Sequence, residues 1–155
     1  MLGKWNGERF VGAGLGLSAH CNRVPVLDGH LECVSLGLKK IASLNEVREA
    51  LRNFEVSAEL AALPSAVRHP VVVLEEDDRP QPRRDVHAGN GMAAAVGRVR
   101  ECPLLDVKLT LLSHNLVRGA AGAALLNAEL LAARSFLPSR LDAKGEERIA
   151  ERVSR

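Results

Sequence analysis

The chain has 155 residues, a formal net charge of +2, 46% hydrophobic residues and 26% charged residues. These values are typical of one ordinary globular domain, and they exclude wholesale disorder and a collagen-like fibre. The near-neutral charge and an aromatic content of only 3% argue against nucleic acid and an anionic membrane as partners, because those partners select basic surfaces and, for nucleic acid, stacking aromatic side chains.

The cysteine pattern indicates the redox compartment of the protein and whether it holds a structural metal. Cys21, Cys33 and Cys102 are an odd set without CxxC spacing, which argues against a disulfide framework and a structural zinc site. We therefore expect no metal, and a cytoplasmic protein, since unpaired thiols are typical of a reducing compartment. No run reaches the roughly 18 consecutive apolar residues of a membrane span.

The first part of the chain predicts a glycine-rich loop followed by two strands. Glycines at 12, 14 and 16 do not fit a dinucleotide-binding fingerprint, which needs a strand before it and a helix after it; we expect a flexible entry loop. Residues 17–26 and 30–38 favour strands, and Asp28-Gly29 between them is typical of a hairpin turn.

The middle of the chain predicts one clear helix. Ser43 stands three residues before Glu46 and forms a capping box, and apolar residues at helical spacing follow over residues 44–53. Residues 54–70 read as a short helix or loop, and residues 71–74 as a short buried strand.

A charged segment and two further strands come next. Residues 75–85 are rich in charge and contain two prolines, which predicts a solvated surface loop. Residues 91–100 and 105–112 favour strands.

The longest helix is predicted over residues 115–136, with Asn115 as its N-cap. Its residues 119–124 are all glycine or alanine, a small surface that permits close approach of another element. Residues 140–153 read as a marginal exposed helix. The order of elements predicts an α+β fold, with a mostly antiparallel sheet covered by helices.

Arg23 and His30 are the pair most suggestive of chemistry. A hairpin can bring the second back towards the first, an arginine can bind a carboxylate through two parallel hydrogen bonds, and a histidine can move a proton near neutral pH. From spacing alone, a surface arginine and a hydrogen-bonded histidine at a strand end are the simpler interpretation.

Four blocks of sequence stand out together: SAHCNRVPVLDGH (18–30), EEDDRPQPR (75–83), GNGMAAAVGRVRECPLLDVK (89–108) and LSHNLVRGAAGAALLNAELL (112–131). In their order and spacing they resemble aspartate-semialdehyde dehydrogenase, most closely its archaeal and fungal branch. The family reduces an aspartyl phosphate with NADPH through a cysteine thioester, on a Rossmann domain joined to an α+β catalytic and dimerisation domain.

The resemblance implies roles for three residues. Arg23 would bind the substrate carboxylate, His30 would be the catalytic general acid and base, and Asn115 would lie at the nicotinamide end of NADP. Residues 1–114 would be part of the catalytic and dimerisation domain. Residues 115–136 would be the C-terminal helix that packs on the Rossmann domain, and residues 137–155 a charged tail.

No part of the chain matches the family's dinucleotide-binding loop or its nucleophilic-cysteine motif. We therefore expect the 155 residues to be a C-terminal portion, inactive alone, and working as a homodimer or with a separate N-terminal half. The expected substrate is a small molecule. Two alternatives stay open, a related malonyl-CoA reductase and a non-catalytic dimerisation module, and the choice between NADP and NAD would be made in the dinucleotide-binding domain.

Overall fold

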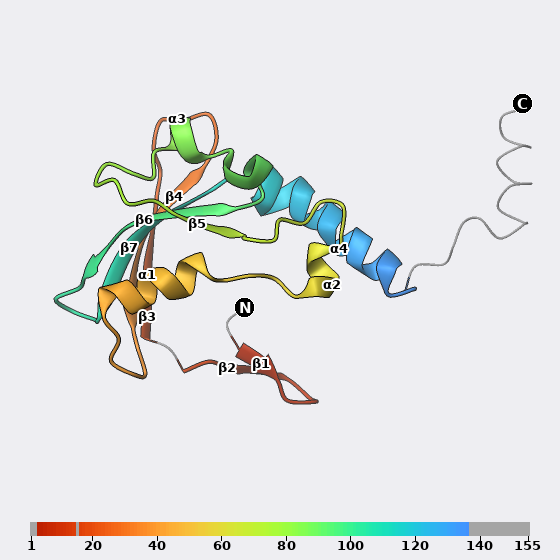
Figure 1. The fold of residues 1–155 in the computed structure, drawn as a ribbon, viewed down its shortest axis with the longest axis horizontal. Coiled ribbons are helices and arrows are strands. Elements are labelled where there is room, and N and C mark those ends of the chain that lie inside the picture. The colour runs from red at the N-terminus through yellow and green to blue at the C-terminus, as the bar shows by residue number, and fades with distance from the viewer. Residues whose placement is uncertain (1–2, 15, 137–155) are drawn as a thin grey trace, which may run out of the picture.

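The fold is built on a five-stranded sheet in the order β3–β4–β7–β6–β5 (Figure 1). The computed structural model describes residues 3–14 and 16–136. The strands are β3 (Gly16–Asn22), β4 (His30–Gly37), β5 (Val71–Val73), β6 (Ala94–Glu101) and β7 (Val107–Ser113). Only β5 and β6 pair in parallel, and the other neighbours are antiparallel. The predicted α+β class with a mostly antiparallel sheet is confirmed.

A separate hairpin precedes this sheet and was not anticipated. β1 (Gly3–Trp5) pairs antiparallel with β2 (Phe10–Gly12). The turn between them begins at Asn6, whose side-chain oxygen accepts hydrogen bonds from the N–H groups of Glu8 (3.0 Å) and Arg9 (2.8 Å). Asn6 is followed by Gly7 with φ of +106°, so an Asn-Gly turn signal was present in the sequence.

One face of the sheet is covered by α1 (Leu44–Arg52), which the sequence placed correctly. The Ser43 side chain accepts a hydrogen bond from the Glu46 N–H, and the Glu46 carboxylate accepts one from the Ser43 N–H, as the capping box predicts. The helix contributes Leu44, Val47 and Leu51 to a core centred on Val96, Val99, Val107 and Leu109.

The opposite face is partly covered by the segment 79–86, and here the expectation of a solvated loop is wrong. The Arg79 guanidinium makes a bidentate ion pair with Asp85, which is only 7% exposed, and the Gln81 N–H donates to the same carboxylate (2.6 Å). The segment crosses β6 so closely that a Cβ on Gly97 would lie 2.3 Å from the Arg79 carbonyl oxygen. Arg79 and Asp85 are therefore paired inside the fold, whereas residues 75–78 and 83–84 are exposed.

Three short helices lie around this core. They are α2 (Ala58–Ala61), α3 (Pro82–Asp85) and the 3₁₀ turn η1 (Ala88–Gly91). A second apolar cluster of Val86, Ala95 and Leu112, extended by Leu31 and Leu74, fills the space between α3 and the sheet.

The long C-terminal helix begins differently from the regular helix predicted over residues 115–136. Its first part, η2 (Val117–Ala121), is π-helical, and α4 (Gly122–Ala133) follows. α4 is tied to the rest of the chain by two polar contacts, from Ser65 to Glu129 (2.6 Å) and between Arg134 and Glu59 (2.7 Å). The predicted helix over residues 140–153 lies outside the described residues.

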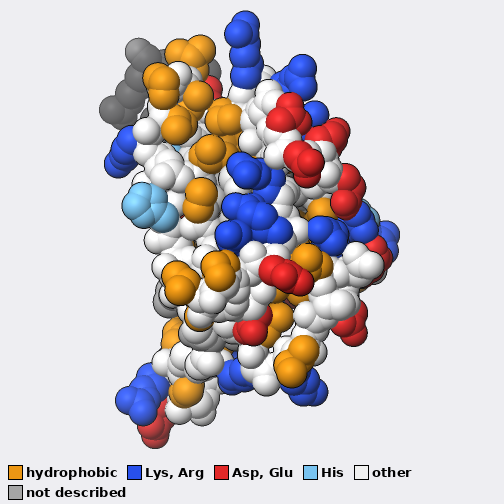
Figure 2. Space-filling model, turned by 90° about the vertical axis from the view of Figure 1, so that its left-hand side faces the viewer, with side chains coloured by type: hydrophobic (Ala, Val, Ile, Leu, Met, Phe, Trp, Pro, Cys, Tyr) orange, Lys and Arg blue, Asp and Glu red, His pale blue; other side chains and the backbone are white. Residues whose placement is uncertain are grey.

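The surface carries charges of both signs. On the face shown in Figure 2, basic side chains gather near the centre, acidic side chains lie beside them, and hydrophobic side chains are spread from the upper left to the lower part. This mixture is in keeping with the net charge of +2. Among the helices of residues 3–14 and 16–136, none is long and apolar enough to cross a membrane.

The Arg79–Asp85 pair generates a stability prediction. Hydrogen bonds from Arg79 hold the pKa of Asp85 below its usual range, so the ionised carboxylate stabilises the fold above the unfolded-state pKa of about 4. Asp85→Asn should lower the free energy of unfolding at pH 7 by about 2 kcal/mol, since it leaves a half-buried guanidinium without its counter-charge.

The measurement is urea denaturation across pH, with Asp77→Asn as the matched control, because Asp77 is an exposed carboxylate just before the segment 79–86. The gap between the native chain and Asp85→Asn should close as the pH falls below about 4, through the native-state pKa of Asp85. An equal effect of both variants at pH 7 would contradict the structural role of the pair.

Candidate functional site

The sheet brings two segments that are far apart in the sequence to one end. His30, the first residue of β4, pairs with Ser113, the last residue of β7. Next to this pair, the Gly29 N–H donates a hydrogen bond to the side-chain oxygen of Asn115 (2.9 Å), across 86 positions of sequence. The structure therefore places Asn115 beside the residue that precedes His30.

Arg23 lies at the same end of the sheet. The last pair between β3 and β4 is Asn22 with Leu31, so Arg23 leaves β3 where His30 enters β4. Both side chains are exposed, and within the described part of the chain no ion pair within 4.0 Å involves Arg23. An exposed guanidinium at the same end of the sheet as an exposed imidazole can bind a carboxylate, with a proton carrier at the same end.

The connection between Arg23 and His30 is not the tight Asp-Gly hairpin that the sequence predicted. β3 ends at Asn22 rather than at residue 26, and residues 23–29 form a longer loop that contains a tight turn from the Val24 carbonyl to the Val26 N–H (2.9 Å). Pro25 has no N–H to continue a ladder.

Gly29 is needed for close packing on the core rather than for a tight hairpin turn. It has φ of +110°, and a Cβ at this position would lie 2.8 Å from Leu112 Cδ1. The glycine thus lets the backbone before His30 pack directly on the core, which fixes where β4 begins.

Asn115 is not the N-cap of the long helix. Its side-chain oxygen is bound to Gly29, and the side chain of His114 takes the capping position instead, with Nδ1 accepting from the N–H groups of Leu116 (3.3 Å) and Val117 (3.5 Å). Asparagine is a much commoner N-cap than histidine, so residue propensity favours Asn115, and the N-cap prediction is wrong. His114 is the residue that the sequence reasoning missed, and its place directly before a helix was the available signal.

Of the three free cysteines, Cys21 is nearest to Arg23, because it lies on β3 opposite Glu32, two residues before Arg23. Cys102 follows β6 at the Glu101–Val107 pair, the opposite end of β7 from Ser113. Its thiol accepts a hydrogen bond from the Leu105 N–H (3.4 Å), and this bond lowers the pKa of Cys102. Cys33 accepts a weak hydrogen bond from Asn22 Nδ2 (3.5 Å). Within the described residues no three His, Cys, Asp or Glu side chains are grouped to hold a metal ion.

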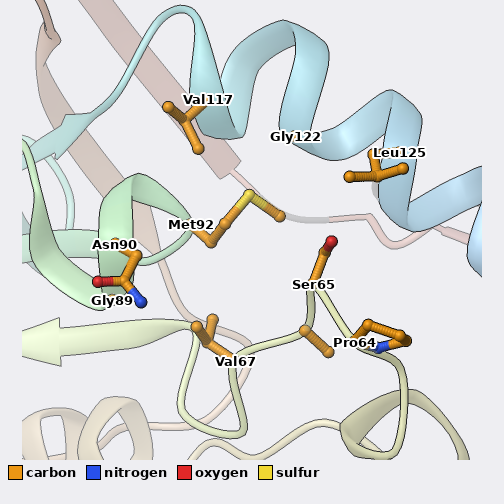
Figure 3. Close-up of a pocket in the computed structure, with 10 residues that line it drawn as sticks. Pro64, Ser65, Val67, Gly89, Asn90, Met92, Val117, Gly122 and Leu125 are labelled. Carbon is orange, nitrogen blue, oxygen red and sulfur yellow. The ribbon is translucent and has the colours of Figure 1, made fainter.

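A cavity of about 290 Å³ lies elsewhere, between the segment 64–67, the loop 89–92 and the start of α4 (Figure 3). Met92, Val117 and Leu125 make its walls largely apolar, with Asn90 and Ser65 contributing polar groups. None of the residues expected from the sequence, Arg23, His30 or Asn115, lines it. The cluster at the end of the sheet is an open surface rather than an enclosed pocket.

Comparison with known proteins gives a consistent result. Residues 2–118 match the family described as semialdehyde dehydrogenase, dimerisation domain. The chain is 46% identical over 123 residues to the aspartate-semialdehyde dehydrogenase of Candida albicans, covering 78% of this chain and 34% of that protein. With the enzyme of Archaeoglobus fulgidus the identity is 47% over 131 residues, covering 84% and 37%.

Solved structures agree. The aspartate-semialdehyde dehydrogenase of Candida albicans with NADP matches with a TM-score of 0.67 and 44% identity, over 74% of this chain and 33% of that one. Aspartate-semialdehyde dehydrogenase II of Vibrio cholerae matches with a TM-score of 0.56 and 27% identity, over 71% and 29%. The chain spans about a third of the length of the curated relatives it matches.

The Gly29–Asn115 hydrogen bond can be tested directly. Asn115→Leu removes the acceptor and should speed hydrogen exchange of the Gly29 amide by about fivefold, since such a bond contributes about 1 kcal/mol. Asn115→Asp retains an oxygen at the same position and should leave the Gly29 amide protected. Equal exchange rates in the native chain and in both variants, followed by NMR, would show that the bond does not form in solution.

Proposed function

The chain belongs to the semialdehyde dehydrogenase family, whose dimerisation domain matches residues 2–118, and from this we propose that it supplies the substrate-binding and acid–base part of an NADP-dependent aspartate-semialdehyde dehydrogenase. The observation that carries the proposal is the convergence of Arg23, His30 and Asn115 at one end of the sheet. In such an enzyme a cysteine thiol would displace phosphate from the acyl carbon of an aspartyl phosphate to form a thioester, which would then be reduced to the semialdehyde.

We assign separate tasks to the two exposed residues. Arg23, which has no ionic partner among the described residues, holds the substrate carboxylate by charge-assisted hydrogen bonds. His30 accepts the proton of the attacking thiol, and returns a proton to the oxygen of the hemithioacetal. The start of β4, fixed by Gly29 and by pairing with Ser113, keeps this imidazole in place.

The fit of the chain to NADP is partial. Asn115 Oδ1 is engaged by the Gly29 N–H, which orients the side chain and turns its two amide N–H donors towards other acceptors, such as the nicotinamide carboxamide. The glycines at 12 and 16 lead from β2 to β3, not from a strand to a helix, so they do not form a phosphate loop. NADPH, when bound, supplies the hydride; the remaining contacts of the dinucleotide are assigned to a Rossmann domain.

The long helix is proposed to meet that Rossmann domain, with residues 1–114 forming part of the catalytic and dimerisation domain. Leu116, Leu125 and Leu131 are 60%, 55% and 43% exposed, and the alanines at 120 and 124 are exposed as well. Such an apolar surface is typical of a docking face. The free cysteines support a reducing, cytoplasmic setting.

Reconstitution tests the function. We expect the 155-residue chain alone not to reduce NADP in the presence of aspartate semialdehyde and phosphate. Mixing it with the N-terminal part of the Archaeoglobus fulgidus enzyme, which this chain does not cover, should generate that activity. Turnover of malonyl-CoA instead would favour the related reductase, and no turnover of either would favour a non-catalytic module.

Variants of the reconstituted enzyme test the residue roles. His30→Gln should lower kcat by about 10²- to 10⁴-fold, the usual contribution of a general acid and base. Arg23→Lys should chiefly raise KM, because the ammonium cannot form two parallel hydrogen bonds. His69→Gln is the matched control, since His69 is exposed and paired with Glu55, just before β5, the edge strand farthest from β3. An unchanged kcat in His30→Gln would contradict its assignment.

A second function, dimerisation, is supported by the open part of the sheet. Val34 and Leu36 pack towards α1, so the alternation of the strands puts Ser18, His20, Cys33 and Ser35 on the other side. None of these four carries a fixed charge, and depletion of charge is typical of the centre of an interface. We assign this uncharged surface to contact with a second copy of the chain.

Sedimentation equilibrium tests the dimer. The native chain should sediment as a dimer, whereas His20→Glu should shift it towards the monomer, because a two-fold axis doubles any like charge placed at an interface. Ala19→Glu, on the same strand and the opposite face, should leave the dimer intact. A native chain that stays monomeric at high concentration would exclude this surface as an interface.

A further inference from the structure

His114 is a buried histidine whose side chain makes specific hydrogen bonds to the backbone. Its side chain is 5% exposed, and its Nδ1 accepts from the N–H groups of Leu116 (3.3 Å) and Val117 (3.5 Å). Its carbonyl oxygen accepts from the Gly119 N–H (2.9 Å). His114 therefore starts the helix with both its side chain and its backbone, and an Nδ1 that accepts hydrogen bonds must carry no proton.

The ring of His114 is held from two sides. Gly91 has φ of +80°, and a Cβ on it would lie 3.0 Å from His114 Cδ2 and 3.1 Å from Val117 Cβ. The ring of His87 meets that of His114 edge to face, with 5.4 Å between the centroids. The loop 88–91 thus closes against the ring, and its last glycine is needed for that approach.

The residue after His114 is Asn115, whose side chain holds the Gly29 N–H. Gly29 in turn precedes His30. A contact path therefore runs from the ring of His114 through the first turn of the helix to Asn115, and from there to the backbone that begins β4. Each step of this path rests on a hydrogen bond or a peptide bond rather than on proximity.

We propose that His114 is a positioning residue for the candidate site: by capping the helix through Nδ1 it fixes the turn that carries Asn115, and so the loop that delivers His30. The proposal rests on the proposed function only in taking Arg23, His30 and Asn115 as the site. The hydrogen bonds from the Leu116 and Val117 N–H groups to His114 do not depend on that function. Without the cap, the N–H groups of Leu116 and Val117 lose their acceptor, and the first turn frays.

Hydrogen exchange of the Gly29 amide, followed by NMR on the full 155-residue chain, tests the proposal. His114→Phe keeps an aromatic ring without an acceptor, and should speed exchange at Gly29 relative to the amides of β6 and β7 by up to about fivefold, the effect expected when the Asn115 acceptor itself is lost. His114→Asn returns an oxygen close to the position of Nδ1, and should restore protection. His87→Phe is the matched control, because it changes the neighbouring ring without touching the cap.

The loop supplies an independent pair of variants. Gly91→Ala should push on the ring of His114 and speed exchange at Gly29, whereas Gly89→Ala should not. Gly89 also has a left-handed φ of +55°, but a Cβ there would lie 2.9 Å from Ala93 Cβ rather than near His114. Both variants strain the same loop, so only the difference between them reports on the ring.

The outcomes are separable. Unchanged exchange at Gly29 in His114→Phe, or an acceleration that β6 and β7 share equally, would overturn the proposal. If His114→Phe does not fold, the ring nitrogens of the native chain decide: an unprotonated Nδ1 in the ¹⁵N spectrum supports the cap, and a protonated Nδ1 overturns it. None of these measurements uses activity, so a failure of the proposed function would show in the reconstitution assay and not here.

Discussion

The pairing of β4 with β7 is the constraint on which the rest of the structure depends. Its register sets His30 against Ser113 and Leu31 against Leu112, and one slipped residue would turn every side chain of β4 to the other face. With the observed register, the end of β7 leads straight into His114 and Asn115, next to the start of β4. The same ladder carries the core, because Val107 and Leu109 face α1 while Leu112 faces α3.

Close backbone approach is what completes this end of the molecule. Gly29 packs on Leu112, Gly91 on His114, and Gly97 under the Arg79 carbonyl. At each of these three positions a methyl group would collide with a neighbour, so the segments that carry the site are held by steric fit as well as by hydrogen bonds. The buried ion pair of Arg79 with Asp85 holds the covering segment in place above β6.

The candidate site is correspondingly a surface and not a pocket. Arg23 and His30 are exposed, and the cavity beside α4 does not include them. Under the proposed function, the exposed arginine, the exposed histidine and the oriented amide would form one wall of a site, and a second wall would exclude water and supply the nucleophile. The chain spans about a third of the length of the curated relatives it matches.

The sequence alone determined the local features of this protein and the family to which it belongs. It located α1 with its capping box, the strands of the main sheet to within a few residues, and the α+β class, because these depend on side-chain periodicity and capping within a few positions. Residue chemistry and the family resemblance also identified the candidate site residues, Arg23, His30 and Asn115.

Only the tertiary structure decided how those residues are used. It showed that residues 79–85 are an internal ion-paired cover rather than a solvated loop, that His114 caps the helix, and that Asn115 instead binds Gly29. Each of these contacts depends on the packing of the whole sheet. Two of them replace a local alternative that the sequence favours: Asn115 as the N-cap, and the charged segment as a solvated loop. Residue propensities within a short window describe only local interactions. The hydrogen bond between Gly29 and Asn115 spans 86 positions and forms only once β4 and β7 have paired.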